Sequence, residues 1–303
     1  MMNSYLQKLL AILTMSALLF MSTGVMAGST PVFVSTDWLA KHINDKDVII
    51  VDMTMGGMQY NRFHIPGAIR LDYGEIVKRR RDRVSVRLSN DELARVLGGA
   101  GISADSYVVI YDDMGGLNAG RLFWEMERIG HKKVSVVQGG LVTWILEYRK
   151  VTNKPTVRKP VTHKKFTAGR NNEAMMLDVV KASNDKQVTL LDVRTDMEYV
   201  GNPRMPRTGH VPGALWWPWM DNVAFEKGFI LVEEDKINQS LARLGVKDKK
   251  QPVIVYCKSG HRAAQAYLTL RSLGYENVKL YDGSMDEYAR VRTNPLVMGK
   301  QPN

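Results

Sequence analysis

The residues of this chain best suited to chemistry lie in one short segment, Cys-Lys-Ser-Gly-His-Arg at residues 257–262. Cys257 is the only cysteine among 303 residues, so it has neither an internal disulfide partner nor a resolving thiol in the same chain. Composition alone leaves two roles for a lone cysteine, a buried filler or a reactive thiol. Lys258, His261 and Arg262 would add cationic character next to the sulfur, which favours the nucleophilic thiolate.

The flanking sequence indicates how this segment is held. An apolar run at 253–256 predicts a buried strand, and an apolar-periodic run at 263–273 predicts a helix. The segment then forms a tight loop at the carboxyl end of a strand, where open α/β sheets bind ligands. Gly260 permits the backbone angles of such a loop. Loop amides and the helix amino terminus converge there, which predicts a cradle for an anion.

Loop length separates two kinds of enzyme that use a strand, a cysteine loop and a helix in this order. Phosphotyrosine-type phosphatases close the loop as Cys-x5-Arg, which is wide enough to surround a phosphate. Cys257 and Arg262 define Cys-x4-Arg, and one amide fewer makes a smaller ring that suits a single sulfur. The spacing therefore favours sulfur chemistry, with a phosphatase or an arsenate reductase as the less favoured alternative.

Four motifs together resemble the rhodanese family. Besides the Cys257 loop they are Asp-Val-Arg at 192–194, Gly-His-Val-Pro-Gly-Ala at 209–214 and Tyr-Asp-Gly at 281–283. The chain is similar to the two-domain form of this family, which has an inactive first domain and an active second one. This resemblance covers essentially the whole chain after residue 27.

The resemblance implies a sulfurtransferase that needs no cofactor. Cys257 would attack the outer sulfur of thiosulfate, release sulfite, and pass the sulfur of its persulfide to cyanide or a thiol with ping-pong kinetics. Arg194 matches a family arginine that helps bind the anionic donor, and Asp192 is expected to hold the loop by hydrogen bonds. The other predicted substrate-binding residues are Lys258, Ser259, Gly260, His261 and Arg262.

The loop departs from both two-domain subtypes of the family. Thiosulfate-type members resemble Cys-Arg-Lys-Gly-Val-Thr here, and mercaptopyruvate-type members resemble Cys-Gly-Ser-Gly-Val-Thr. Lys258 agrees with the first subtype and Ser259 with the second, whereas His261 and Arg262 agree with neither. The added positive charge favours thiosulfate, a dianion, and leaves 3-mercaptopyruvate as a second donor. A non-catalytic carrier of persulfide would need the same cysteine and stays open.

The chain contains an internal duplication, because four blocks recur in the same order in both halves. The paired blocks are 48–52 with 188–192, 63–68 with 209–214, 107–111 with 252–256, and 129–136 with 273–280. Short apolar runs alternate with amphipathic stretches, which predicts an α/β fold with a mostly parallel sheet flanked by helices in each half. We expect rhodanese-like domains at 28–150 and 171–303, joined by a basic linker at 151–170.

The first half lacks the nucleophile. Asp112 occupies the position of Cys257, Asp113 follows it, and the loop is one residue longer before its helix. A carboxylate cannot perform thiolate chemistry, and paired acids would repel a sulfur oxyanion. We therefore expect the domain at 28–150 to be catalytically inactive and to serve structure and the domain interface.

Several conspicuous residues receive structural interpretations. His64 and His210 occupy matched positions in both halves, including the inactive one, which favours a role in the fold. Trp216, Trp217 and Trp219 are expected to pack in the core or the domain interface. The 17 methionines are scattered without ligand-like spacing, so no metal is expected.

The amino terminus and the charge bear on location and partners. Residues 1–27 combine Lys8, an apolar run too short to span a bilayer and a small-residue cleavage pattern, which predicts a signal peptide and export to a bacterial periplasm without stable membrane insertion. The net charge of +11 is concentrated at 78–83 and 149–170. Export argues against a nucleic-acid partner. Two interpretations of the charge stay open, solvated loops that raise solubility and the steering of small anions to the site.

Overall fold

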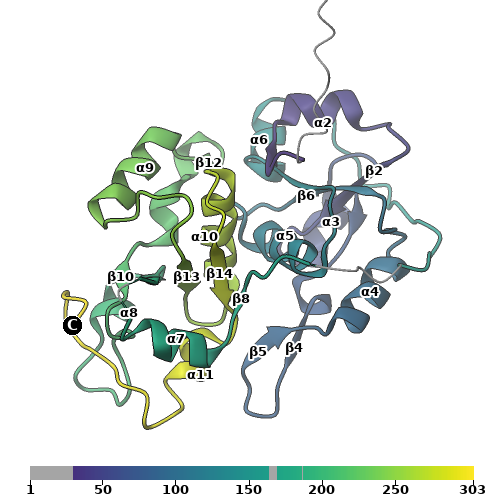
Figure 1. The fold of residues 1–303 in the computed structure, drawn as a ribbon. Helices are drawn as coiled ribbons and strands as arrows, with labels where there is room; N and C mark the ends of the chain where they lie inside the picture. The colour runs from purple at the N-terminus through teal and green to yellow at the C-terminus, as the bar shows by residue number, and fades with distance from the viewer. Residues whose placement is uncertain (1–29, 164–168, 186) are drawn as a thin grey trace, which may run out of the picture.

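The computed structural model describes residues 30–163, 169–185 and 187–303, so the predicted signal peptide and part of the predicted linker lie outside the described residues. Figure 1 shows two halves, each built from strands and flanking helices. Within the described residues, each half contains a five-stranded sheet whose neighbouring strands all pair in parallel. The predicted α/β fold with two parallel sheets flanked by helices is confirmed.

The first sheet has the strand order β1-β7-β6-β2-β3. Its strands are β1 (Phe33–Val34), β2 (Val48–Asp52), β3 (Ile69–Arg70), β6 (Tyr107–Tyr111) and β7 (Val134–Val137). The helices of this half are α2 (Thr36–His42), α3 (Gly57–Arg62), α4 (Asn90–Gly99), α5 (Leu117–Ile129) and α6 (Gly140–Leu146). The central strands are continuous apolar runs because helices cover the sheet on both faces.

The second sheet has the order β10-β9-β13-β14-β8. Read from β8 to β10, this is the order of the first sheet, because β8, β14, β13, β9 and β10 are the duplicates of β1, β7, β6, β2 and β3. Its strands are β8 (Glu173–Ala174), β9 (Thr189–Asp192), β10 (Leu215–Trp216), β13 (Val253–Tyr256) and β14 (Val278–Tyr281). The helices of this half are α7 (Met176–Ala182), α8 (Asp196–Val200), α9 (Glu234–Arg243), α10 (His261–Ser272) and α11 (Ser284–Tyr288).

Short elements complete the two halves. The basic run at 78–83 lies in an antiparallel hairpin of β4 (Val77–Arg79) and β5 (Ser85–Arg87). A second hairpin pairs β11 (Val223–Ala224) with β12 (Ile230–Leu231). The 3-10 turns are η1 (Tyr73–Glu75), η2 (Trp219–Asn222) and η3 (Phe225–Lys227).

Helices α5 and α10 join the two halves, and they lie next to each other where the halves meet (Figure 1). The two helices run in the same direction. His261 at the start of α10 bonds to Asn118 at the start of α5, and Arg271 near the carboxyl-terminal end of α10 pairs with Glu127 near the carboxyl-terminal end of α5. Gly120 lies at the contact, where a Cβ atom would come within 2.9 Å of the carbonyl oxygen of Ala264.

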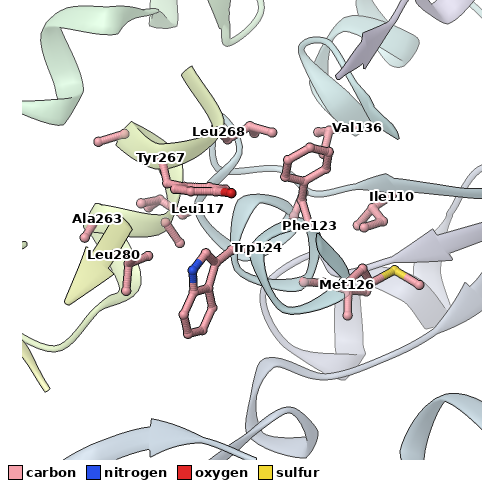
Figure 2. Close-up of a cluster of buried hydrophobic side chains, with 14 of the residues drawn as sticks. Ile110, Leu117, Phe123, Trp124, Met126, Val136, Ala263, Tyr267, Leu268 and Leu280 are labelled. Atoms are coloured by element: carbon pink, nitrogen blue, oxygen red, sulfur yellow. The ribbon is translucent and has the colours of Figure 1, made fainter. Parts of the chain in front are cut away.

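The same two helices contribute to one continuous hydrophobic core. Leu117 and Trp124 of α5 pack in a buried cluster with Ala263, Tyr267 and Leu268 of α10 (Figure 2). Burying one large apolar side chain contributes about 1.5–3 kcal/mol. The two halves therefore share one hydrophobic core. This packing brings residues of the first half next to the Cys257 loop of the second half.

The two matched histidines occupy equivalent positions in the fold. His64 and His210 are buried, and each ring stacks on a tyrosine ring with 3.8 Å between centroids. Nε2 of each ring lies 3.1 Å from a carbonyl oxygen in the segment that follows the last helix of its own half. The carbonyl belongs to Lys154 for His64 and to Gln301 for His210. These contacts support the structural role that the sequence suggested.

Of the three neighbouring tryptophans, Trp217 and Trp219 are buried in the core cluster, and Trp216 is 37% exposed. No helix within the described ranges is long and apolar enough to cross a membrane. The same ranges contain no group of three or more His, Cys, Asp or Glu side chains placed to hold a metal ion.

The close approach at Gly120 gives a prediction for stability. Gly120→Ala should lower the free energy of unfolding by about 1–3 kcal/mol, because backbone must shift to admit the methyl group. The matched control is Gly99→Ala in α4, where nothing lies within 4 Å, so helix propensity should raise stability by about 0.5–1 kcal/mol. Urea unfolding of both variants measures the difference, and equal effects would contradict the proposed helix contact.

Candidate active site

Cys257 directly follows β13, the central strand of the second sheet, and the chain turns into α10 within four residues. This is the strand, loop and helix that the sequence predicted. Gly260 ends the loop with a φ of +78°, and a Cβ atom there would lie 2.5 Å from Oδ1 of Asp282. Cys257 itself is fully buried. The sulfur-bearing residue thus sits at the amino terminus of a 12-residue helix, where backbone N–H groups favour an anion.

Ser284, at the start of α11, fixes the shape of the loop. Its Oγ accepts hydrogen bonds from the amides of Cys257 and Gly260, both at 3.1 Å, and donates to the carbonyl of Tyr281 at 2.8 Å. Ser284 has a φ of +48°, and the duplicate position is Gly140 with a φ of +53°. A side chain in this left-handed conformation is strained, and strain of this kind is found at functional sites. The sequence analysis missed this residue, although the exchange of glycine for serine between the halves was visible.

The loop of the first half shows what such a loop can bind. Oδ1 of Asp112 accepts from the amides of Met114 and Gly116, each at 3.0 Å. Oδ2 accepts from the amides of Asn118 at 2.9 Å and Ala119 at 3.0 Å. Burial raises the pKa of Asp112, and the hydrogen bonds from these amides oppose the rise. Four backbone donors thus converge on one carboxylate, and the inactive loop is an anion cradle that its own side chain fills.

The Cys257 loop is followed by amides equivalent to those that hold Asp112 in the first half. The duplicates of Asn118 and Ala119 are Arg262 and Ala263, in the first turn of α10. Throughout the part of the chain that the structure describes, no side-chain oxygen accepts from the amides of Arg262 and Ala263, and the N-cap Gly260 has no side chain to do so. We infer that these donors are left for a negatively charged sulfur on Cys257.

Two of the predicted substrate-binding cations are already engaged with carboxylates. Nε and Nη2 of Arg194 donate to Asp192 at 2.5–3.1 Å, and Nη2 also donates to the carbonyl of Gly209 at 2.8 Å. Asp192 therefore has the internal hydrogen-bonding role that was expected of it. Lys258 is exposed, and its Nζ lies 2.5 Å from Oδ1 of Asp286. Donor binding by Arg194 and Lys258 stays a prediction.

Arg262 is held by Glu198 of α8 in a two-pronged ion pair. Nη1 donates to Oε2 at 2.6 Å and Nη2 to Oε1 at 2.8 Å, and both side chains are partly buried. Although burial opposes it, the hydrogen bonds that Arg262 donates to Glu198 and the charge of Cys257 raise the pKa of Arg262. Ser259 is half-buried in the same loop.

The expectation that His261 adds positive charge is wrong. Burial, followed by the charges of Arg121 and Arg262, lowers the pKa of His261 to about 4, so the imidazole is neutral at neutral pH. Nδ2 of Asn118 donates to the carbonyl of Met53 at 2.8 Å, which turns Oδ1 of Asn118 toward the histidine. His261 consequently donates from Nε2 to Asn118 at 2.7 Å. A buried ring among guanidinium groups resists protonation, and the single N–H of the neutral imidazole is used in this bond to Asn118.

The first half supplies further residues to the candidate site. Besides Asn118, the ring of Tyr73 lies 4.6 Å from that of His261. Burial raises the pKa of Tyr73 to about 12, and the charges of Asp282 and Cys257 act in the same direction. The sequence analysis did not name Tyr73 or Asn118, since neither lies in a motif and both reach the loop only because α5 packs against α10.

The fold and the loop define a tandem α/β protein with two duplicated domains, of which one carries a cysteine at the start of the loop that leads into a helix. Residues 35–147 and 176–290 both match the family model described as Rhodanese-like domain. The chain therefore belongs to the rhodanese family, in its two-domain form, and the sulfur transfer that the sequence resemblance implied agrees with the names of its relatives.

Three relatives illustrate this similarity. The sulfur carrier protein TtuD from Thermus thermophilus is 31% identical over 288 residues, which cover 89% of this chain and 98% of that protein. A putative thiosulfate sulfurtransferase from Mycobacterium bovis is 31% identical over 281 residues, which cover 88% of this chain and 98% of that protein. The crystal structure of SseA from Escherichia coli, described as a 3-mercaptopyruvate sulfotransferase, is 28% identical with a TM-score of 0.74, covering 84% and 99% of the two chains.

The geometry of Ser284 predicts that one substitution can slow persulfide formation on Cys257 without a large change in the free energy of unfolding. Ser284→Gly suits the left-handed backbone, so the free energy of unfolding should change by less than about 1 kcal/mol. Without the hydroxyl the loop is free to move, and persulfide formation on Cys257 should slow on the order of tenfold. Ser284→Ala keeps the strain and loses the hydroxyl, so both quantities should fall. Wild-type rates in Ser284→Gly, measured by mass spectrometry, would show that the hydroxyl does not hold the loop.

Proposed function

We propose that this protein moves a sulfane sulfur from thiosulfate to a thiophilic acceptor, cyanide or a thiol, through a persulfide on Cys257. The observation that carries the proposal is the contrast between the two loops. In the first half four amides hold the carboxylate of Asp112, two of them in the first turn of α5. In the second half the equivalent first-turn amides of α10, those of Arg262 and Ala263, have no side-chain acceptor, and Cys257 begins the loop.

In the first half-reaction, the Cys257 thiolate attacks the outer sulfur of thiosulfate. A bond forms between Sγ and that sulfur, the sulfur–sulfur bond of thiosulfate breaks, and sulfite leaves with the electron pair. The persulfide keeps one negative charge, which the amides in the first turn of α10 and the positive end of the helix stabilise. No proton has to move in this step, so it needs no general base.

In the second half-reaction, the acceptor attacks the outer sulfur of the persulfide. Cyanide takes that sulfur as thiocyanate, and the Cys257 thiolate is the leaving group. The amides that stabilise the persulfide also stabilise this thiolate, so one cradle serves both steps. Because Cys257 is fully buried, side chains around the loop must move to admit both substrates, and Tyr73, His261 and Arg262 are only partly buried.

The names of the relatives support sulfur transfer and are consistent with two sulfur donors, thiosulfate and 3-mercaptopyruvate. One relative is named as a putative thiosulfate sulfurtransferase, and SseA is described as a 3-mercaptopyruvate sulfotransferase. Thiosulfate remains our first choice for the donor because the amides at the start of α10 favour an anion, although Arg194, Lys258 and Arg262 are each paired with a carboxylate. A second candidate function, a sulfur carrier that hands persulfide to a partner, is favoured by the name of the Thermus relative.

The direct test is to incubate the purified protein with thiosulfate and record intact mass and sulfite release. We expect a mass gain of one sulfur atom on Cys257, one equivalent of sulfite, and removal of the added sulfur by cyanide. Cys257→Ser should show neither change, while Asp112→Asn in the inactive loop should still form the persulfide. Absence of both mass gain and sulfite release in the wild type, as in Cys257→Ser, would refute the proposal.

The same experiment separates the enzyme from the carrier. Turnover with cyanide or small thiols indicates a sulfurtransferase with soluble acceptors. A stoichiometric persulfide that none of these acceptors removes favours the carrier, since the sulfur then leaves only to a specific partner.

We also propose that the protein is exported to the periplasm, on the pattern of residues 1–27 alone. Amino-terminal sequencing of the protein from a periplasmic fraction would test this. A mature chain that begins at Gly28 is expected, and a chain that stays in the cytoplasm with residues 1–27 attached would contradict it.

A further inference from the structure

The cationic side chains around the Cys257 loop are paired with carboxylates, which the sequence analysis did not predict. In residues 30–163, 169–185 and 187–303, each of four cationic side chains near the loop has a carboxylate partner. The pairs are Arg121 with Asp282, Arg194 with Asp192, Lys258 with Asp286, and Arg262 with Glu198. His261 is neutral at neutral pH, because its pKa is lowered to about 4. The side chains around the sulfur therefore carry little net positive charge, although the sequence of the loop is strongly basic.

Burial distinguishes the four pairs. The pairs of Arg121 and Arg194 are almost fully buried, with every member at most 7% exposed, so their carboxylates balance charges that the fold could not otherwise enclose. Lys258 is 61% exposed, and water screens its charge whether or not Asp286 holds it. The pair of Arg262 and Glu198 lies between these extremes, at 21% and 30% exposure. It is accessible to a substrate and still only weakly screened.

Position adds to this distinction. Arg262 closes the six-residue loop that begins at Cys257, and its guanidinium lies within electrostatic range of the sulfur. Arg194 lies close enough to Arg262 for the two positive charges to repel each other. The Glu198 carboxylate therefore neutralises the guanidinium that closes the Cys257 loop.

Glu198 is also fixed in place by its own helix. Its Oε2 accepts from the amide of Thr195 at 3.2 Å and from the Thr195 hydroxyl at 2.9 Å, which forms a capping box at the start of α8. Although burial alone would raise it, hydrogen bonds from Arg262 and Thr195 lower the pKa of Glu198 to about 2, so the group is charged throughout the neutral range. The carboxylate is therefore a permanent part of the resting site.

We propose that Glu198 is a specificity-determining residue, which by neutralising Arg262 limits the preference of the Cys257 loop for doubly charged sulfur donors. The inference rests on the proposed sulfur transfer at Cys257 and names its charge selectivity. Glu198 acts through Arg262 and is a positioning residue. With it, the site accepts donors of one and two negative charges on more equal terms; without it, the site favours dianions.

Glu198→Gln tests this with little disturbance of the backbone, because glutamine also completes a capping box. Thiosulfate is a dianion and 3-mercaptopyruvate a monoanion at neutral pH, so one added positive charge should help thiosulfate about twice as much in free energy. At several ångströms in a partly screened site, we expect kcat/KM to rise on the order of tenfold for thiosulfate and about threefold for 3-mercaptopyruvate. The ratio of the two values should rise about threefold and should fall back as salt is added.

Glu127→Gln is the matched control. Glu127 holds Arg271 and Tyr267 near the far ends of α5 and α10, in a partly buried ion pair of the same kind but away from Cys257. Loss of this pair should affect stability and leave the ratio of the two donors unchanged. A ratio that moves equally in both variants would reduce Glu198 to a structural residue.

An independent readout keeps the inference testable if neither donor forms a persulfide, which would be a failure of the proposed function instead. Alkylation of Cys257 by iodoacetate, an anion, can be compared with alkylation by neutral iodoacetamide, and the ratio of rates reports the local charge alone. We expect this ratio to rise in Glu198→Gln and to stay constant in Glu127→Gln. A folded Glu198→Gln protein with unchanged donor and alkylation ratios would overturn the inference.

Discussion

Backbone N–H groups at the start of an α-helix have no partner within the helix, and the site of this protein is built around that constraint. Both α5 and α10 begin directly after a loop at the end of a central strand. In the first half the carboxylate of Asp112 accepts from two such amides, those of Asn118 and Ala119, and from two amides of the preceding loop. In the second half the thiol of Cys257 takes the place of the Asp112 carboxylate. The two halves can therefore be compared directly: in the first the amides bind a carboxylate of the same loop, and in the second we propose that the first-turn amides of α10 bind a sulfur on Cys257.

The packing of α5 against α10 makes the two cradles neighbours. Because Gly120 and Ala264 let the backbones approach closely, the first turn of one helix lies beside the first turn of the other. Asn118 serves both: its amide holds Asp112, and its side chain orients His261. The first domain shares its core with the second, and its residue Asn118 contacts the Cys257 loop through His261, so both domains contribute to the candidate site.

The sequence was sufficient to predict the fold and the loop, because both rest on local patterns. Continuous apolar runs marked the buried strands, and the position of Cys257 between such a run and a helix located the cradle. Charge was harder to predict. His261 was taken as cationic, since its burial among Arg121 and Arg262 depends on the domain interface. The carboxylate partners of the basic residues were also missed, although the capping box of Glu198 was visible, because pairing depends on distances between separate elements. Ser284 escaped notice for a related reason: its hydroxyl acts on a loop 24 residues or more away.

The central claim is that the amides of the first turn of α10 hold a negatively charged sulfur on Cys257. A crystal structure of the protein treated with thiosulfate tests it most directly. The account predicts one additional sulfur bonded to Sγ of Cys257, with the amides of Arg262 and Ala263 donating to it, and an unchanged Asp112 in the other loop. An unmodified Cys257, or an added sulfur that points away from the first turn of α10, would contradict it.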